Sequence, residues 1–459
     1  MKTSCSNQIR MASLAGGCLL VLCGAVQAQD WPEWRGPNRQ AKAVDFKAPA
    51  AWPKELTRKW QVTVGEGVAT PALVGDRLYV FARQDGKEVT RCLEAGTGKE
   101  LWQESYDALG ATGPSQGFSG PRSSPLVTQG KVVTVGVRGV ISCLDAATGK
   151  VLWRKDDFKA WPSFFVASSP LVVEGLVVAQ LGGADNGALV AYELGSGAER
   201  WRWSGSSPGY ASPVILAVGG EKLVFAQTET AQVAVKAADG KVVWESAGAG
   251  AGEGGGGGPG GRGGRGGGGR DYKATTPAVD GAMFVLTGRG NKAVRFERSG
   301  DGFSARELWS HSEKPAQFAS PVLKDGLVIG FSAANEFFCL DAQDGALLWS
   351  VQMPSPAEGQ AAPAAERPAG QEGARGPGGP GGRGGRMGGG GYGSLVDVGP
   401  AVLALTPSSD LIVFKPSRER FEGLARYKVA ESPTHAYPVV SGNRVFVKDR
   451  EAVILWTLE

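Results

Sequence analysis

Histidine is the side chain best suited to acid–base and metal chemistry near neutral pH, and this chain has 2 histidines, His311 and His435. Neither lies in a motif with metal-ligand spacing. A histidine-rich metal centre or a catalytic triad would therefore rest almost entirely on one residue. We predict no catalytic residue and no metal ligand in this chain, and a plain loop or surface position for each histidine.

Carboxylates and thiols recur at fixed places in a repeated pattern. Asp145 and Asp341 each stand in a Leu-Asp-Ala step, and we expect them to accept hydrogen bonds from a following turn. Cys92, Cys143 and Cys339 each come directly before such a Leu-acid-Ala step. The chain has 6 cysteines, and these three remain once a predicted signal peptide at 1–28 is removed. An odd number of cysteines cannot pair completely, so we interpret these three as small buried apolar residues.

These positions recur because the chain is built from a repeat. The clearest unit opens at Ser124-Pro125 and closes with the step from Ala146 to Trp153, Ala-Ala-Thr-Gly-Lys-Val-Leu-Trp. Further units open at Thr70-Pro71, Ser169-Pro170, Ser212-Pro213, Thr276-Pro277, Ser320-Pro321 and, more weakly, Gly399-Pro400 and Tyr437-Pro438. A period near 40 to 50 residues is typical of a propeller or a solenoid.

Each unit has the pattern of four short antiparallel strands. Apolar and polar residues alternate with a period of two, and the Ala-Thr-Gly-Lys step provides a tight turn. The tryptophan after that turn is expected to bury its ring between neighbouring blades. We therefore predict an all-β fold, an eight-bladed β-propeller of four-stranded antiparallel blades over residues 56–459.

The ends of the repeat array predict how the ring closes. The last unit, from Tyr437 to Leu458, ends soon after its third strand, while an unpaired strand at 56–64, which contains Trp60, precedes the first unit. We expect this N-terminal strand to complete the eighth blade. Closure in this way would leave no sheet edge exposed between the first and last blades.

A candidate binding site follows from the propeller geometry, because the loop that enters each inner strand lines the mouth of the central channel. The residues three before each repeat proline are Val68, Arg122, Ala167, Tyr210, Ala274, Phe318, Asp397 and His435. The residue type at this position differs from unit to unit, whereas positions with a structural role have the same residue type in most units. With nearby aromatic residues, it predicts a ligand or peptide funnel of Arg122, Phe165, Tyr210, Tyr272, Phe318, Asp397, His435 and Tyr437. That these residues simply fill the channel remains the alternative.

Two segments interrupt the repeat, 247–270 and 354–394. Both are dominated by glycine, with proline and arginine, and much of the total of 71 glycines lies in them. Neither can bury enough apolar surface to offset its ordering entropy, so we expect solvated, flexible inserts on one rim. Contact with a surface, a polysaccharide or a protein is the functional alternative, and we expect no nucleic-acid partner.

The N-terminus has the layout of an export signal. Lys2 and Arg10 precede an apolar run from Met11 to Val26, and small residues lie at the predicted cleavage site after Ala28. We predict a signal peptide at 1–28, a leader segment at 29–55, and a periplasmic or secreted monomer. A lipid anchor at Cys18 or Cys23 is the less favoured alternative, and no later stretch reaches the length of a membrane span.

The step Ala146 to Trp153 and its copies resemble the repeat of pyrroloquinoline-quinone (PQQ) propellers. This repeat is shared by quinoprotein alcohol dehydrogenases and BamB-type outer-membrane assembly lipoproteins, and the resemblance covers residues 56–458. The stretch from Asp30 to Asn38 also resembles a leader that precedes such propellers in exported bacterial proteins. Its aromatic residues and proline suggest a segment that packs on the blades.

The resemblance allows several functions. A quinoprotein dehydrogenase requires PQQ on the ring axis, a calcium ion and an aspartate base, and many also have adjacent cysteines, which this chain lacks. We therefore expect no cofactor, and favour a non-catalytic module that binds an envelope protein, a peptide or a glycan. A PQQ-dependent oxidoreductase acting on alcohols or sugars, with PQQ and calcium, is the alternative, and a purely structural propeller is a third hypothesis.

Overall fold

The computed structural model describes Met1 and residues 30–246, 273–300, 302–353 and 391–458. Apart from Met1, the predicted signal peptide at 1–28 lies outside the described residues, as do the insert at 247–270, Tyr272 and positions 354–390 of the second insert. The first gap lies between β17, Val242–Glu245, and β18, Ala278–Asp280, and the second between β25, Leu347–Gln352, and β26, Ser394–Asp397.

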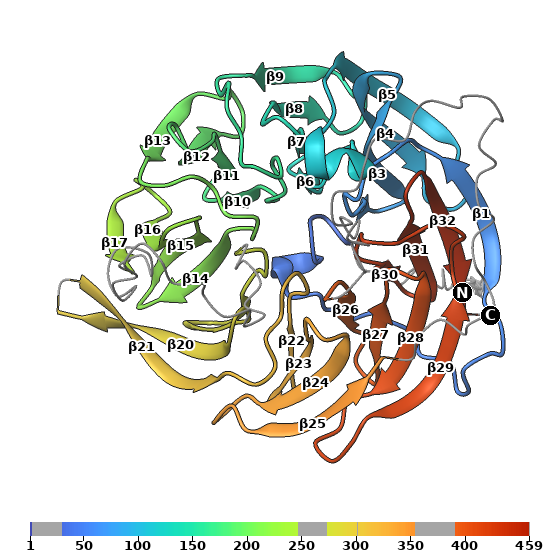
Figure 1. The fold of residues 1–459 in the computed structure, drawn as a ribbon. Coiled ribbons are helices and arrows are strands. Elements are labelled where there is room, and N and C mark those ends of the chain that lie inside the picture. The colour runs from blue at the N-terminus through green and yellow to red at the C-terminus, as the bar shows by residue number, and fades with distance from the viewer. Residues whose placement is uncertain (2–29, 247–272, 301, 354–390, 459) are drawn as a thin grey trace, which may run out of the picture.

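The fold is an all-β propeller of eight four-stranded antiparallel sheets, which surround a central axis (Figure 1). Blades 1 to 4 contain β2–β5, β6–β9, β10–β13 and β14–β17, at Ala72–Val74, Arg77–Gln84, Lys87–Glu94, Glu100–Asp107; Leu126–Thr128, Lys131–Val135, Ile141–Asp145, Val151–Lys155; Leu171–Val173, Leu176–Leu181, Ala188–Glu193, Glu199–Trp203; and Val214–Val218, Glu221–Gln227, Gln232–Lys236, Val242–Glu245.

Blades 5 to 7 contain β18–β21, β22–β25 and β26–β29, at Ala278–Asp280, Met283–Leu286, Asn291–Ser299, Gly302–His311; Val322–Lys324, Leu327–Phe331, Glu336–Asp341, Leu347–Gln352; and Ser394–Asp397, Val402–Leu405, Asp410–Lys415, Glu422–Lys428. Blade 8 contains β30–β32 and β1, at Val439–Ser441, Arg444–Lys448, Ala452–Thr457 and Thr57–Thr63. The sheets confirm the predicted fold class.

The N-terminal strand closes the ring. Strand β1 pairs antiparallel with β32, so the two ends of the chain share blade 8 (Figure 1). Trp60 of β1 then donates a hydrogen bond from Nε1 to the Ala95 carbonyl of blade 1, at 3.0 Å. The eighth blade therefore contacts the first in the same way that other blades contact their neighbours.

Tryptophan rings pack between the outer parts of the blades. Five of them lie against a glycine in the turn of the next blade, where a Cβ atom would stand only 2.5–2.8 Å from the ring. These pairs are Trp60 with Gly98, Trp102 with Gly149, Trp153 with Gly197, Trp201 with Gly240, and Trp309 with Gly345. The glycines have φ between 71° and 75°, so the turn requires glycine both for its backbone conformation and for its contact with the ring.

Serine and threonine hydroxyls link the blades close to the axis. The backbone N–H of the residue before the repeat proline donates to the hydroxyl at the same position of the next blade, at 2.8–2.9 Å. The donor and acceptor pairs are Thr70 with Ser124, Ser124 with Ser169, Ser169 with Ser212, Ser212 with Thr276, and Thr276 with Ser320. Tyr437 N–H of blade 8 donates to the Thr70 hydroxyl of blade 1, at 2.9 Å, which links the last blade to the first.

The predicted start of blade 7 at Gly399-Pro400 is wrong. The inner strand β26 precedes this dipeptide, which instead forms the turn to β27, closed by Val398 N–H donating to Ala401 at 3.0 Å. Gly399 takes a φ of 82°, which suits a tight turn. Asp397 therefore lies near the end of the inner strand, away from the loop that enters it, and Ser394 is the first residue of β26.

The three cysteines and the repeated acids have the predicted structural roles. Cys92, Cys143 and Cys339 are buried and unpaired. They lie next to a register shift between the third and outer strands of their blades. The Asp145 carboxylate accepts hydrogen bonds from the backbone of Ala147 and Thr148 at 3.1 and 2.9 Å.

The leader fills the channel. Trp31 pairs with Leu73 of blade 1, and residues Ala41 and Ala43 both bond to the backbone of Asp397 in blade 7, at 2.8 Å. Between these points the short 3₁₀ helix η1, Pro37–Arg39, lies near the centre of the ring (Figure 1). The leader thus packs on the inner strands, as its composition suggested.

One arginine of the leader, Arg39, is buried in this core. The Arg39 guanidinium, 5% exposed, donates to the carbonyl groups of Ser169 at 3.2 Å and Pro213 at 3.1 Å, and to that of Pro170. It also forms an ion pair with Glu33 at 2.8 Å. The chain therefore crosses the axis and joins blade 3 to blade 4 through one side chain.

The hydrogen bond between blade 8 and the Thr70 hydroxyl of blade 1 gives a direct test of ring closure. Thr70→Val keeps the shape of a side chain that is 1% exposed, but leaves the Tyr437 N–H without its acceptor. We expect a loss of about 1–3 kcal/mol in the free energy of unfolding, measured by urea titration with tryptophan fluorescence. Thr70→Ser retains the acceptor and should lose clearly less. Equal losses in the two variants would show that the hydroxyl does not support closure.

Candidate functional site

Six side chains gather where the loops enter the inner strands of five blades, blades 2, 4, 6, 7 and 8. This axial cluster consists of Phe118, Arg122, Tyr210, Phe318, Tyr392 and His435. The Phe318 and Tyr392 rings stack with centroids 4.1 Å apart, and Tyr392 meets His435 edge-on at 5.2 Å. His435 in turn meets Phe118 at 4.8 Å. Four rings of the cluster, those of Phe318, Tyr392, His435 and Phe118, therefore form a continuous series of contacts.

Arg122 supplies the charge of the axial cluster. Its guanidinium donates to the Phe118 carbonyl at 2.9 Å and to that of Ser115 at 3.4 Å, which ties it to the 3₁₀ helix η2, Gly113–Phe118. Burial lowers the pKa of Arg122, and the nearby hydroxyl groups of Tyr392 and Tyr210 oppose this effect. The side chain is thus a partly buried cation inside an aromatic surround.

The structure brings four of the predicted funnel residues together. Arg122, Tyr210, Phe318 and His435 all belong to the axial cluster, and the Tyr210 hydroxyl accepts a hydrogen bond from the Phe164 backbone at 3.1 Å. Ligand binding by these residues stays a prediction.

Three other predicted residues lie elsewhere. Phe165 is buried and stacks on Trp161 at 5.9 Å, Asp397 forms an ion pair with Lys324 at 3.1 Å, and Tyr437 packs against Trp34 of the leader at 5.5 Å. Asp397 does not belong to the cluster because Pro400 lies in the turn between β26 and β27 and not at the start of β26. Tyr272 lies outside the described residues.

Tyr392 is the member that the sequence pattern missed. Aligning the hairpin turn of blade 7 with that of blade 1 puts Tyr392 at the place that Val68 has in blade 1. The apolar residues Leu395 and Val396, followed by the turn at Gly399, indicate where the inner strand of blade 7 begins. The long glycine-rich segment before this strand has no repeat pattern, so it gives no help in aligning the strand with those of the other blades.

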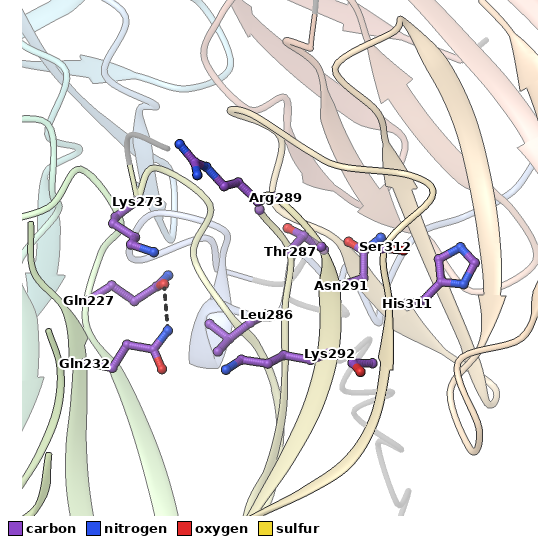
Figure 2. Close-up of a pocket in the computed structure, with 13 residues that line it drawn as sticks. Gln227, Gln232, Lys273, Leu286, Thr287, Arg289, Asn291, Lys292, His311 and Ser312 are labelled. Atoms are coloured by element: carbon purple, nitrogen blue, oxygen red, sulfur yellow. Dashed lines mark hydrogen bonds between the residues drawn. The ribbon is translucent and has the colours of Figure 1, made fainter. Parts of the chain in front are cut away.

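A pocket of about 330 Å³ lies off the axis, between blades 4 and 5 on the same face as the axial cluster. Its walls include the ends of β15 and β19 and the starts of β16 and β20, with Lys273 at the entry to blade 5. Figure 2 shows the heads of Lys273, Arg289 and Lys292 on the side of the pocket where Gln227 and Gln232 lie. Sequence reasoning did not find this site, because no repeat position marks it.

The sheet topology and the family match define the class of the protein: an eight-bladed propeller of PQQ-like repeats. The family described as outer membrane protein assembly factor BamB matches residues 85–351 and 301–374. The chain therefore belongs to this family.

Relatives come from two groups. BamB of Yersinia pestis is 24% identical over 313 residues, which cover 64% of this chain and 70% of that protein. The quinohemoprotein alcohol dehydrogenase of Comamonas testosteroni is 28% identical over 195 residues, 40% of this chain but only 27% of the dehydrogenase. The match therefore spans about a quarter of that enzyme.

Solved structures show the same fold. The chain superposes on BamB from Moraxella catarrhalis with a TM-score of 0.56 and 14% identity, covering 88% of this chain and 97% of that one. For the Comamonas testosteroni dehydrogenase the TM-score is 0.60 with 15% identity, covering 95% and 81%. At these identities the likeness concerns the fold alone.

The axis of the ring is occupied by parts of the chain itself. The leader occupies the channel, with Arg39 bonded to carbonyl groups of blades 3 and 4 and four rings of the axial cluster in a continuous series of contacts. Within the described ranges no three His, Cys, Asp or Glu side chains gather to hold a metal ion. In that same part of the chain, no helix has the length and apolar character needed to cross a membrane.

His435 makes the stability of the axial cluster depend on pH. Burial lowers the pKa of His435 to about 4, so the folded state favours the neutral imidazole. Since the unfolded value is 6.5, stability should be complete above pH 6.5 and fall as the pH drops toward 4, by roughly 3 kcal/mol for this group.

The measurement is the melting temperature between pH 7 and pH 4 for the native chain and for His435→Gln. The difference between the two proteins isolates His435 from the other titrating groups. The native chain should lose more stability on acidification. Two parallel curves would contradict a buried neutral histidine.

Proposed function

We propose that the chain is a non-catalytic, exported propeller that binds a protein partner in the cell envelope. The observation that carries this proposal is the occupied axis. Where a dehydrogenase of this fold would need space for a cofactor, this chain places its own leader, with Arg39 donating to carbonyl groups of two blades. Family membership with an outer membrane assembly factor and the signal-like N-terminus support an envelope location.

The binding surface that we propose is the face that carries the axial cluster. On this face the loop between blades 1 and 2 holds Leu109, one of the large apolar residues that the fold leaves exposed, at 67%. Leu109 follows the outer strand β5, so it lies on the rim of this face and is accessible to a partner. The opposite face is occupied by short hairpin turns and by the two ends of the leader.

Site-specific photo-crosslinking tests the partner and the face together. A photoreactive phenylalanine analogue at Leu109, in cells, should give one discrete adduct with an envelope protein. The same analogue at Lys222, which is exposed at the far end of β15 on the opposite face, should give none. No adduct at Leu109, or an identical adduct at both positions, would contradict the proposal.

The oxidoreductase alternative has its own test. Purified chain, titrated with PQQ in the presence of calcium, should show no saturable quinone absorbance change and no dye-linked oxidation of alcohols or sugars, because the axis is filled. Stoichiometric PQQ binding with turnover would replace the proposed function by that of a quinoprotein dehydrogenase.

A further inference from the structure

Two arginines without an ion pair lie where blades 1 and 2 meet, on the face proposed for partner binding. Arg83 is near the end of β3, and Arg138 lies in the turn between β7 and β8. Neither guanidinium forms a hydrogen bond or an ion pair with another described residue. In both side chains Nε is buried, while the residue as a whole is half-buried, so the Nη groups reach the solvent.

Aromatic rings hold Arg138 in place. Its guanidinium carbon lies 4.5 Å from the Trp161 ring centroid and 5.9 Å from that of Phe165, and the two rings stack. The turn itself is closed by Gly139 N–H, which donates to the Gly136 carbonyl at 2.9 Å. Stacking on a ring leaves the N–H groups in the plane of the guanidinium free to donate. Arg138 is therefore already ordered before a ligand binds, which lowers the entropic cost of binding.

The buried side chain of Glu88 connects the two arginines. Glu88 lies directly opposite Arg83 in the β3–β4 pair, so both side chains are on the same face of the sheet. Its Oε1 accepts from the N–H of Val137, the residue before Arg138, at 2.7 Å, and its Oε2 accepts from the Tyr106 hydroxyl. Burial raises the pKa of the Glu88 carboxyl, and the charge of Arg83 opposes this effect. At 2% exposure Glu88 lies beneath the surface and positions the turn that carries Arg138.

The segment that carries Leu109 contacts both sides of this junction. A Cβ atom on Gly110 would stand 2.8 Å from Nε of Arg83. Ala111 packs with Val137 in a small apolar cluster, beside the β7–β8 turn. Leu109, 67% exposed, therefore lies beside the two arginines, and a partner that covers it comes within reach of both.

The acids near this junction leave the two arginines available. Glu66 pairs with Arg450 at 3.4 Å, and Asp107 pairs with Lys87 at 2.6 Å. Asp85 is exposed at the tip of the β3–β4 hairpin and forms no ion pair with a described residue. On this face of blades 1 and 2, no described carboxylate is in contact with either arginine, so the counter-charge has to come from outside the chain.

The partner must therefore bring an apolar side chain together with carboxylates. A guanidinium binds a carboxylate through two parallel charge-assisted hydrogen bonds, and arginine is enriched among the residues that dominate protein interfaces. We propose that the partner docks an acidic segment here, with an apolar residue on Leu109 and Asp or Glu side chains bound by Arg83 and Arg138. This inference rests on the proposed function and adds the chemistry of the partner surface.

The crosslink from Leu109 provides the reference signal for the test. The double variant Arg83→Gln/Arg138→Gln removes both charges and should lower the yield of the adduct at least about tenfold, since two charge-assisted contacts are lost. The matched control is Lys222→Gln/Lys241→Gln, which removes two exposed cations from the opposite face and should leave the yield unchanged. Matching melting temperatures will show that the arginine variant is folded.

A charge exchange between the two proteins identifies the ligand group. Mass spectrometry of the adduct should place the contact on the partner within a few residues of an Asp or Glu. Arg138→Glu should abolish the adduct, and changing that partner acid to Arg should restore it.

The outcomes separate this inference from the function on which it rests. No adduct in the native chain overturns both. An adduct with normal yield in Arg83→Gln/Arg138→Gln, or a contact on the partner without a nearby acid, overturns the acidic segment and leaves the binding function standing.

Discussion

A hydroxyl that accepts a hydrogen bond from the backbone of the preceding blade holds this propeller together near its axis. The link recurs from Thr70 to Ser320, and Tyr437 returns it to Thr70. The contact repeats with similar geometry from blade 1 to blade 6 and from blade 8 to blade 1, so it sets the angle between these neighbouring blades. The outer tryptophan–glycine contacts repeat with the same step. Together they constrain the ring at two radii, and β1 completes the last blade.

The closed ring creates a channel that the leader fills. Arg35 and Arg39 become fully or almost fully buried, and burial lowers the pKa of both guanidinium groups. Glu33 pairs with Arg39, while Arg35 lies between the Trp34 and Tyr437 rings, 5.7 Å from each centroid. Burying these charges has a desolvation cost, which the ion pair with Glu33 and the carbonyl groups that accept from Arg39 offset in part.

Blade 7 shows where pattern reasoning reached its limit. In six units a serine or threonine before a proline marks the inner strand, and the structure places those strands as predicted. In blade 7 the proline belongs to the turn, and Tyr392 takes the position that had been assigned to Asp397. The sequence predicted a convergence of Arg122, Tyr210, Phe318 and His435, because a repeat position maps to one ring. It could not show that the rings of Phe118 and Tyr392 pack against these residues.

The local pattern alone was enough to specify strand alternation, the glycine turns, eight units and closure by the N-terminal strand. These features follow from short-range periodicity, which is written directly in neighbouring residues. The filled axis, the pocket between blades 4 and 5 and the two arginines beside Glu88 required the folded chain. They arise where residues far apart in sequence meet between blades, and no repeat position records which side chain will face which.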